Sequence, residues 1–159
     1  MTPGDIKRPV HLHWRFIGLV AFGGVFGALA RYGLGLAIPA PDAWPLPTLI
    51  INLTGALALG ALLEGLSRRG PDTGRRRVLR LALGTGFLGA YTTYSTLALD
   101  AVHLIMAGTV PGFAWYLVLS LFGGAAATTT GIWLGAWQHR RTSMADAGAA
   151  PRRDSRGAR

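Results

Sequence analysis

Four long apolar stretches, separated by short connections, dominate the pattern of this chain. Each stretch is long enough to cross the roughly 30 Å of bilayer hydrocarbon as a helix, which needs about 20 residues. Several prolines mark the first connection, Gly70-Pro71 the second and Pro111-Gly112 the third. The pattern therefore predicts an all-α integral membrane protein with four transmembrane helices, at Trp14 to Ile38, Leu46 to Leu66, Val78 to Met106 and Phe113 to Trp137.

The regions before and after these stretches are polar and basic. We predict a basic N-terminal segment of residues 1–13, a four-helix membrane domain of residues 14–138 and a disordered basic cytoplasmic tail of residues 139–159. The tail is rich in Arg, Ala and Gly and has too little apolar surface to fold alone. The first apolar stretch is longer than the roughly 7–15 residues typical of a signal peptide, and it contains Arg31. We therefore interpret it as a retained helix.

Composition supports a membrane protein. Charged residues make up only 14% of the chain, against about 25% in a typical soluble domain. The net charge of +9 would favour a nucleic-acid partner in a soluble protein. Here the arginines lie in short segments between apolar stretches, so membrane topology explains them and we expect no nucleic-acid partner. The absence of cysteine excludes disulfides and thiolate metal sites.

The basic residues are distributed unevenly among the connections. Fifteen of the sixteen Lys and Arg residues fall on one side of a four-helix topology, and the first and third connections contain none. By the positive-inside rule, both termini are cytoplasmic. The fifteen are Lys7, Arg8, Arg15, Arg68, Arg69, Arg75, Arg76, Arg77, Arg80, Arg140, Arg141, Arg152, Arg153, Arg156 and Arg159.

The third apolar stretch contains a polar run from Gly86 to Leu97, with three threonines, a serine and two tyrosines. Hydrocarbon penalises each unpaired polar group by several kcal/mol, so this run must face protein or water. Polar residues in a glycine-interrupted segment at membrane depth are typical of a site that handles a small solute or ion. The run therefore predicts a pathway.

Two further polar residues have both a structural and a functional interpretation. Arg31 is either a snorkelling anchor beside Tyr32 or a cation that concentrates anions at a pore mouth. The side-chain amide of Asn52 either forms an interhelical hydrogen bond or provides two N–H donors for an anion. Thr48 lies four residues before Asn52 and therefore on the same helical face.

The fourth stretch has a similar polar face, with Tyr116 and Ser120 four residues apart. Thr128, Thr129 and Thr130 are of a type that commonly bonds back to its own helix. Gly131 and Gly135 form a G-x-x-x-G pair, as expected of a close-packing face, and we give Gly23, Gly24 and Gly27 the same interpretation. The histidines and acids are scattered near helix ends and form no catalytic arrangement, so we do not expect an enzyme.

Three motifs lie in order on the first three helices. They are Gly23-Gly24-Val-Phe-Gly27-Ala28-Leu-Ala-Arg31-Tyr32, Thr48-Leu-Ile-Ile-Asn52-Leu-Thr-Gly55 and Gly86-Phe87-Leu-Gly89-Ala-Tyr-Thr92-Thr93-Tyr94-Ser95-Thr96. In order and spacing these motifs resemble those of the Fluc/CrcB fluoride channels. The resemblance covers the membrane part, from about Phe16 to Trp137.

This resemblance implies a passive, fluoride-selective channel subunit that exports fluoride from the cytoplasm across the bacterial plasma membrane and so relieves fluoride toxicity. It implies an antiparallel dimer and a third helix broken at its centre. Backbone carbonyls of Gly89 and Thr92 would hold a structural Na⁺ on the dimer axis. Asn52 would donate to fluoride. The implied ion pathway comprises Arg31, Thr48, Asn52, Tyr94, Ser95, Thr96, Leu97, Tyr116 and Ser120.

The chain also departs from the family pattern. The family usually has phenylalanines at the positions of Tyr94 and Leu97, and their ring edges flank fluoride; Gly124 stands at the position of a polar-track serine. An antiparallel homodimer requires one sequence to insert both ways, whereas the charge bias here favours one orientation. We therefore infer a heterodimer with an oppositely oriented paralogous subunit.

Two alternative functions stay open. One is a non-conducting accessory subunit of such a channel, because Leu97 supplies no aromatic edge. The other is a small multidrug-type four-helix transporter. That mechanism needs a carboxylate in the first helix, and none lies between Trp14 and Ile38.

Overall fold

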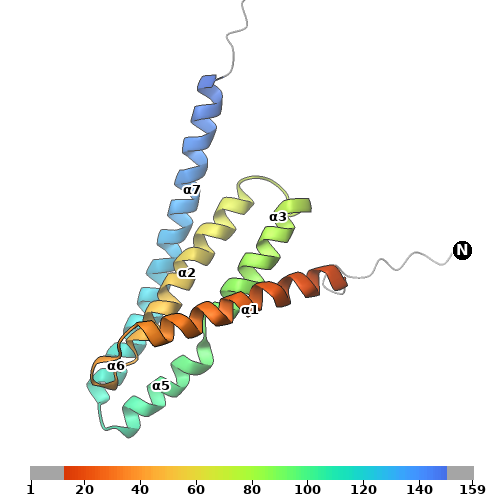
Figure 1. The fold of residues 1–159 in the computed structure, drawn as a ribbon. Coiled ribbons are helices and arrows are strands. Elements are labelled where there is room, and N and C mark those ends of the chain that lie inside the picture. Colours follow the sequence, from red (N-terminus) through yellow and green to blue (C-terminus); the bar gives the residue numbers. More distant parts are fainter. Residues whose placement is uncertain (1–12, 150–159) are drawn as a thin grey trace, which may run out of the picture.

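The structure, a computed structural model, describes residues 13–149 and the side chains of residues 13–141. All regular secondary structure in this part of the chain is helical, which confirms the all-α prediction (Figure 1). The elements are α1 (Trp14–Ala37), η2 (Pro41–Ala43), α2 (Leu46–Ser67), α3 (Gly74–Leu79), η3 (Arg80–Leu88), α4 (Gly89–Tyr91), α5 (Tyr94–Met106), α6 (Val110–Val118), η4 (Leu119–Gly123) and α7 (Gly124–Ala149). η2 is a 3₁₀ turn, and η3 and η4 are π-helical.

Three helical runs in the described residues are long and apolar enough to cross a membrane: α1, α2 and the run Val110–Arg141. They correspond to the first, second and fourth predicted stretches, and this confirms a multi-pass membrane protein. The third predicted stretch is not one continuous helix. Helical residues continue from α3 through η3 to the end of α4 at Tyr91, and α5 starts at Tyr94 after two residues in extended conformation.

Helix α7 packs along α2 in the most extensive contact between elements. The two backbones touch at glycines, because a Cβ on Gly131 would overlap the carbonyl of Leu57. At Gly135, an added Cβ would lie 2.7 Å from the carbonyl oxygen of Ala61. The G-x-x-x-G pair therefore forms a close-packing face, as the sequence predicts.

Helix α1 runs obliquely across α2 and the α3 segment in Figure 1. It packs mainly on η3 and α4. The contact again uses glycines: Gly23 lies against the carbonyl of Ala82, and Gly27 lies against that of Phe87. Any side chain at these two positions would push the helices apart, so the first motif fixes where α1 crosses η3.

Helices α5 and α6 lie together at the opposite end of the molecule from the end of α7 (Figure 1). Gly108, at φ 71°, and Thr109 form the tight connection between them. Thr109 donates through both its backbone N–H and its hydroxyl to the carbonyl of Leu104. Tyr116 is fully buried in this region, in a cluster with Leu49, Ala101 and Leu104.

The C-terminal boundary differs from the prediction. Helix α7 continues through His139, where we placed the start of a disordered tail, and is described as far as Ala149. Ala and Arg, which are good helix formers, make up five of the eleven residues from His139 to Ala149, so the helix continues beyond the apolar residues. Residues 1–12 and 150–159, which hold the rest of the predicted terminal segments, lie outside the described residues.

Candidate ion pathway

The polar run predicted to handle an ion contains the change from helical to extended backbone. Thr92 has φ −76° and ψ 156°, and Thr93 has φ −147° and ψ 124°. Both residues are extended in the middle of an otherwise helical stretch. Such a change leaves backbone groups without their helical partners, and at membrane depth these groups need other partners.

Asn52 of α2 supplies two of these partners. Its Nδ2 donates to the carbonyl of Thr93 at 2.9 Å, and its Oδ1 accepts the N–H of Thr93 at 2.8 Å. The side-chain amide therefore pairs with both backbone groups of one residue, 41 positions away in the chain. One Nδ2 hydrogen remains for another acceptor, because a carboxamide carries two N–H donors.

These bonds change the state of two carbonyls. In an uninterrupted α-helix, the N–H of Thr93 would donate to the carbonyl of Gly89, and that of Thr96 to the carbonyl of Thr92. Here Thr93 N–H donates to Asn52, and Thr96 N–H donates to the Thr93 hydroxyl at 3.2 Å. The N–H groups that would occupy these two carbonyls in a helix therefore donate to side chains instead. The carbonyls of Gly89 and Thr92 are the ones that the family resemblance implies as cation ligands.

Hydroxyl groups cluster at the start of α5. The Thr93 Oγ1 lies 3.2 Å from the Ser95 hydroxyl and 3.0 Å from the Thr96 hydroxyl. Thr93 is also the N-cap of α5, because its side chain accepts the Thr96 N–H. Sequence reasoning assigned no role to Thr93 by itself, although threonine is one of the residues favoured at an N-cap.

A second polar group lies between α2, α5 and α6. The buried Tyr116 hydroxyl donates to Asp100 Oδ2 at 3.3 Å. The buried Thr48 is within reach of the same Tyr116 hydroxyl. This arrangement joins two predicted pathway residues, Thr48 and Tyr116. Sequence reasoning missed Asp100 because its partner lies 16 residues away on another helix.

The Ser120 hydroxyl oxygen is the one buried polar side-chain atom without a hydrogen-bond partner in the part of the chain that the structure describes. Its hydroxyl lies in the π-helical segment η4. Threonines of α7 satisfy their hydroxyls on their own backbone, as with Thr128 and the carbonyl of Gly124 at 2.9 Å. Ser120 does not, so its hydroxyl is available to a ligand.

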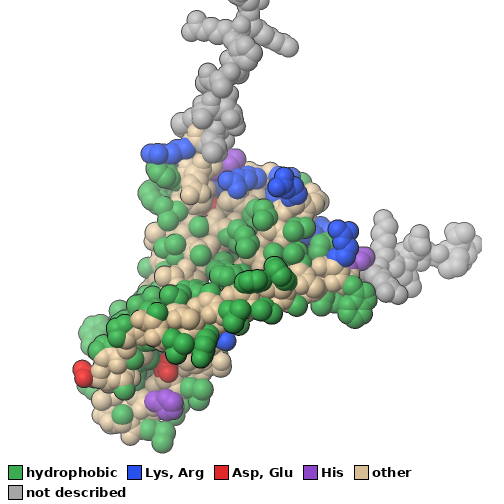
Figure 2. Space-filling model, in the orientation of Figure 1, with side chains coloured by type: hydrophobic (Ala, Val, Ile, Leu, Met, Phe, Trp, Pro, Cys, Tyr) green, Lys and Arg blue, Asp and Glu red, His purple; other side chains and the backbone are tan. Residues whose placement is uncertain are grey.

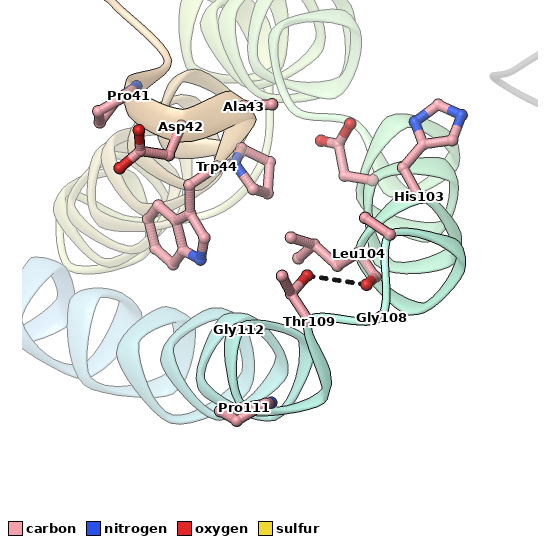
Figure 3. Close-up of a pocket in the computed structure, with 13 residues that line it drawn as sticks. Pro41, Asp42, Ala43, Trp44, His103, Leu104, Gly108, Thr109, Pro111 and Gly112 are labelled. Atoms are coloured by element: carbon pink, nitrogen blue, oxygen red, sulfur yellow. Dashed lines mark hydrogen bonds between the residues drawn. The ribbon is translucent and has the colours of Figure 1, made fainter.

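A cavity of about 920 Å³ opens at the outer end of this region, between η2, α5 and the start of α6 (Figure 3). Trp44 and Leu104 point toward it from opposite walls, while the imidazole of His103 points away. Asp100 also lines it. Because Asp100 also accepts the hydrogen bond of the buried Tyr116 hydroxyl, it links the lining of the cavity to that buried polar group.

The remaining predicted pathway residues are not all brought together. Tyr94 is 82% exposed, whereas Leu97 packs against the cluster that contains Tyr116. Arg31 is partly exposed on α1, and no ion pair is recorded for it within residues 13–141. Within this single chain, Tyr94 and Leu97 therefore do not form a pair that could flank one ion.

Basic side chains gather at one end of the molecule. Figure 2 shows Arg side chains along the upper edge, near the end of α2 and the start of α3 in Figure 1. The acids Asp42 and Asp100 belong to the cavity at the other end. The charge asymmetry seen in the sequence is therefore also an asymmetry between the two ends of the folded chain.

Comparison with known proteins identifies the family. The family described as CrcB-like protein, camphor resistance (CrcB), matches residues 18–132. The chain belongs to this family. The match runs from within α1 to within α7 and includes the extended Thr92 and Thr93 with their partner Asn52.

Several curated relatives carry the name fluoride-specific ion channel. The chain is 49% identical to FluC 2 of Leifsonia xyli subsp. xyli over 128 residues, which is 80% of this chain and 88% of that protein. It is 44% identical to FluC 1 of Cutibacterium acnes over 120 residues, or 75% of this chain and 80% of that protein. It is 42% identical to FluC 1 of Moorella thermoacetica over 120 residues, or 72% and 81%.

Proposed function

We propose that this CrcB family member is a subunit of a passive, fluoride-selective channel that exports fluoride from the cytoplasm. The names of its relatives support this function. The structural observation that carries it is the extended segment at Thr92 and Thr93, pinned by Asn52 and surrounded by hydroxyls. On this proposal, the extended segment is the central break of a third membrane helix.

The chemistry of fluoride requires such a lining. Fluoride is small and strongly hydrated, so a dry pore must replace its water with several N–H or O–H donors. The free Nδ2 hydrogen of Asn52 and the unpartnered Ser120 hydroxyl are donors of this kind, and Thr48 would extend the polar lining beside Tyr116. The Tyr116 hydroxyl, held by Asp100 and beside Thr48, extends the track toward the cavity of Figure 3. Arg31 would raise the local concentration of anions at a pore mouth.

The residues present fit a structural Na⁺. Hard monovalent and divalent cations prefer oxygen ligands. The carbonyls of Gly89 and Thr92 are oxygens whose helical N–H partners donate elsewhere. Two such carbonyls from each of two subunits would surround an ion on a dimer axis. A bound cation would offset the negative potential of these carbonyls.

An antiparallel dimer with an oppositely oriented paralogous subunit is part of this proposal. Fifteen basic residues on one side and none on the other favour a single insertion, with both termini cytoplasmic. A homodimer of opposed copies would require half of the chains to invert this charge bias. The partner would then have its basic residues in the first and third connections.

The test is fluoride efflux from proteoliposomes, measured with a fluoride electrode. We expect fluoride-selective efflux from this chain co-expressed with a neighbouring paralogue, and none from this chain alone. Efflux from this chain alone would contradict the heterodimer but support the channel. No fluoride efflux from either preparation, with folded protein confirmed by gel filtration, would overturn the channel.

A second candidate is an accessory subunit whose own pore does not conduct. The exposed Tyr94 and the packed Leu97 favour it, because neither presents a ring edge to a shared site within the chain. Substituting Asn52→Ala in this chain alone of the co-expressed pair separates the two. An accessory subunit predicts unchanged efflux, whereas a conducting one predicts loss.

A further inference from the structure

We propose that the groove between α1 and the α3–η3 segment binds the headgroup and one acyl chain of an anionic phospholipid. The groove has a volume of about 590 Å³ and lies at the basic end of the molecule. This site is separate from the ion pathway. It uses residues that the proposed channel function leaves unassigned.

The shape of the groove follows from the way α1 crosses η3. The two helices touch where Gly23 meets the carbonyl of Ala82 and where Gly86 meets that of Val20. From this crossing they diverge toward Trp14 and Gly74. The space between them is therefore closed at the crossing and open toward the basic end.

The walls of the groove are apolar along most of its length. Helix α1 contributes Phe16, Ile17, Val20 and Ala21, and η3 contributes Leu81 and Thr85. The last two lining residues, Arg77 and Arg80, precede Leu81 in the chain and so stand at the open end. A groove with apolar walls and arginines only at its open end is complementary to an amphiphile with an anionic headgroup.

The charge at this mouth is not neutralised by the protein. Asp72 forms ion pairs with both Arg77, at 3.8 Å, and Arg80, at 2.5 Å, so one carboxylate faces two guanidinium groups. Arg77 and Phe16 also line an adjoining cavity of about 600 Å³, together with Arg15 and Arg75. No ion pair is recorded for Arg15 or Arg75 within residues 13–141.

The apolar walls and the excess arginine charge together indicate which kind of ligand the groove binds. Guanidinium groups bind phosphate oxygens in bidentate geometry, and basic pockets between membrane helices commonly hold anionic headgroups. A soluble anion would leave the apolar wall uncovered, and a zwitterionic lipid would not neutralise the excess arginine charge. A phospholipid with a negatively charged headgroup would cover the apolar walls with an acyl chain and neutralise the arginines at the open end.

The experiment is native mass spectrometry of the purified protein, titrated with phosphatidylglycerol and with phosphatidylcholine of the same chains. We expect selective retention of phosphatidylglycerol. The double variant R15Q/R75Q should weaken it about thirtyfold, or ~2 kcal/mol at about 1 kcal/mol per basic residue. The control R140Q/R141Q removes the same charge from the same end without touching either cavity, and should leave retention unchanged.

A second pair of variants tests the acyl chain without changing charge. Ala21→Trp places a ring in the groove and should reduce retention of phosphatidylglycerol, whereas Val25→Trp, on an exposed position of α1 outside the groove, should not. Equal retention of the two lipids, equal loss in the control, or no effect of Ala21→Trp would each overturn the proposal. So would displacement of the lipid by millimolar inorganic phosphate. Fluoride efflux is not part of the readout, so the lipid site can fail while the channel stands.

Discussion

The threonines of α7 and those at the start of α5 satisfy their hydroxyl groups in opposite ways. Thr128, Thr129 and Thr130 each donate to the carbonyl four residues earlier in their own helix. Thr93 instead accepts a backbone N–H and contacts two neighbouring hydroxyls. The first arrangement keeps the helix closed, and the second opens it. The same residue type therefore indicates packing or an ion site according to whether the local backbone is helical.

The two regions also differ in what holds them to α2. Helix α7 lies on α2 through glycines and close backbone contact. The extended segment is held to α2 by the two hydrogen bonds of Asn52. The contact between α7 and α2 therefore depends on the absence of side-chain bulk at the glycines. The contact between the extended segment and α2 depends on hydrogen-bond partners.

Replacing Asn52 should have the largest effect. Asn52→Asp keeps one oxygen for the Thr93 N–H but turns the second oxygen against the Thr93 carbonyl. Leaving a buried backbone group unsatisfied costs about 1–3 kcal/mol, so we expect fluoride efflux from the co-expressed pair to fall by at least ~tenfold. Leu59→Met on the same helix, a volume-conserving change, serves as the control. Unchanged efflux in Asn52→Asp would show that the amide does not hold the pathway.

Crowding the α2–α7 contact comes next. Gly131→Ala would drive a Cβ into the Leu57 carbonyl, and such overpacking costs about 1–3 kcal/mol. We expect a lower melting temperature in detergent by scanning fluorimetry. Gly124→Ala, in the same helix, meets nothing within 4 Å and should leave the melting temperature unchanged. Equal melting temperatures for the two variants would contradict the assigned packing.

Removing the cap of α5 should have a moderate effect. Thr93→Val abolishes the bond to the Thr96 N–H, and loss of an N-cap costs about 1 kcal/mol. We expect slower efflux and a greater dependence of efflux on Na⁺ concentration, because the Thr92 carbonyl can regain its helical partner. Thr93→Ser should restore both properties. Failure of serine to rescue them would mean that the methyl group, not the hydroxyl, matters.

The smallest effect should come from Thr129. Its hydroxyl bonds only to the carbonyl of Ala125 on an exposed face of α7, so Thr129→Val should change stability by less than about 0.5 kcal/mol. Efflux and melting temperature should both match the unsubstituted protein. A large loss in either would show that the α7 threonines contribute more than local hydrogen bonds.

Much of the architecture could be predicted from the sequence. Apolar length predicted the spans, because a bilayer of fixed thickness sets the length of a helix. The G-x-x-x-G spacing predicted which face of α7 would pack, since helical periodicity is a local property. Helix α7 runs past His139, because helix propensity does not require hydrophobicity, whereas the predicted boundary followed only the loss of apolar character.

The site was only partly predictable, because its partners are far apart in the chain. The polar run and Asn52 were recognisable as candidates, but their pairing across 41 residues was not. That pairing takes the helical N–H partner of the Gly89 carbonyl, while the Thr93 hydroxyl takes that of the Thr92 carbonyl. The link between Asp100 and Tyr116 likewise depends on how α5 meets α6. The sequence by itself determined the membrane class, the uneven charge and the residue types available to an ion. Only the tertiary structure decided which polar groups satisfy one another and which, such as the Ser120 hydroxyl, stay available, because a hydrogen bond depends on distances that helix packing sets.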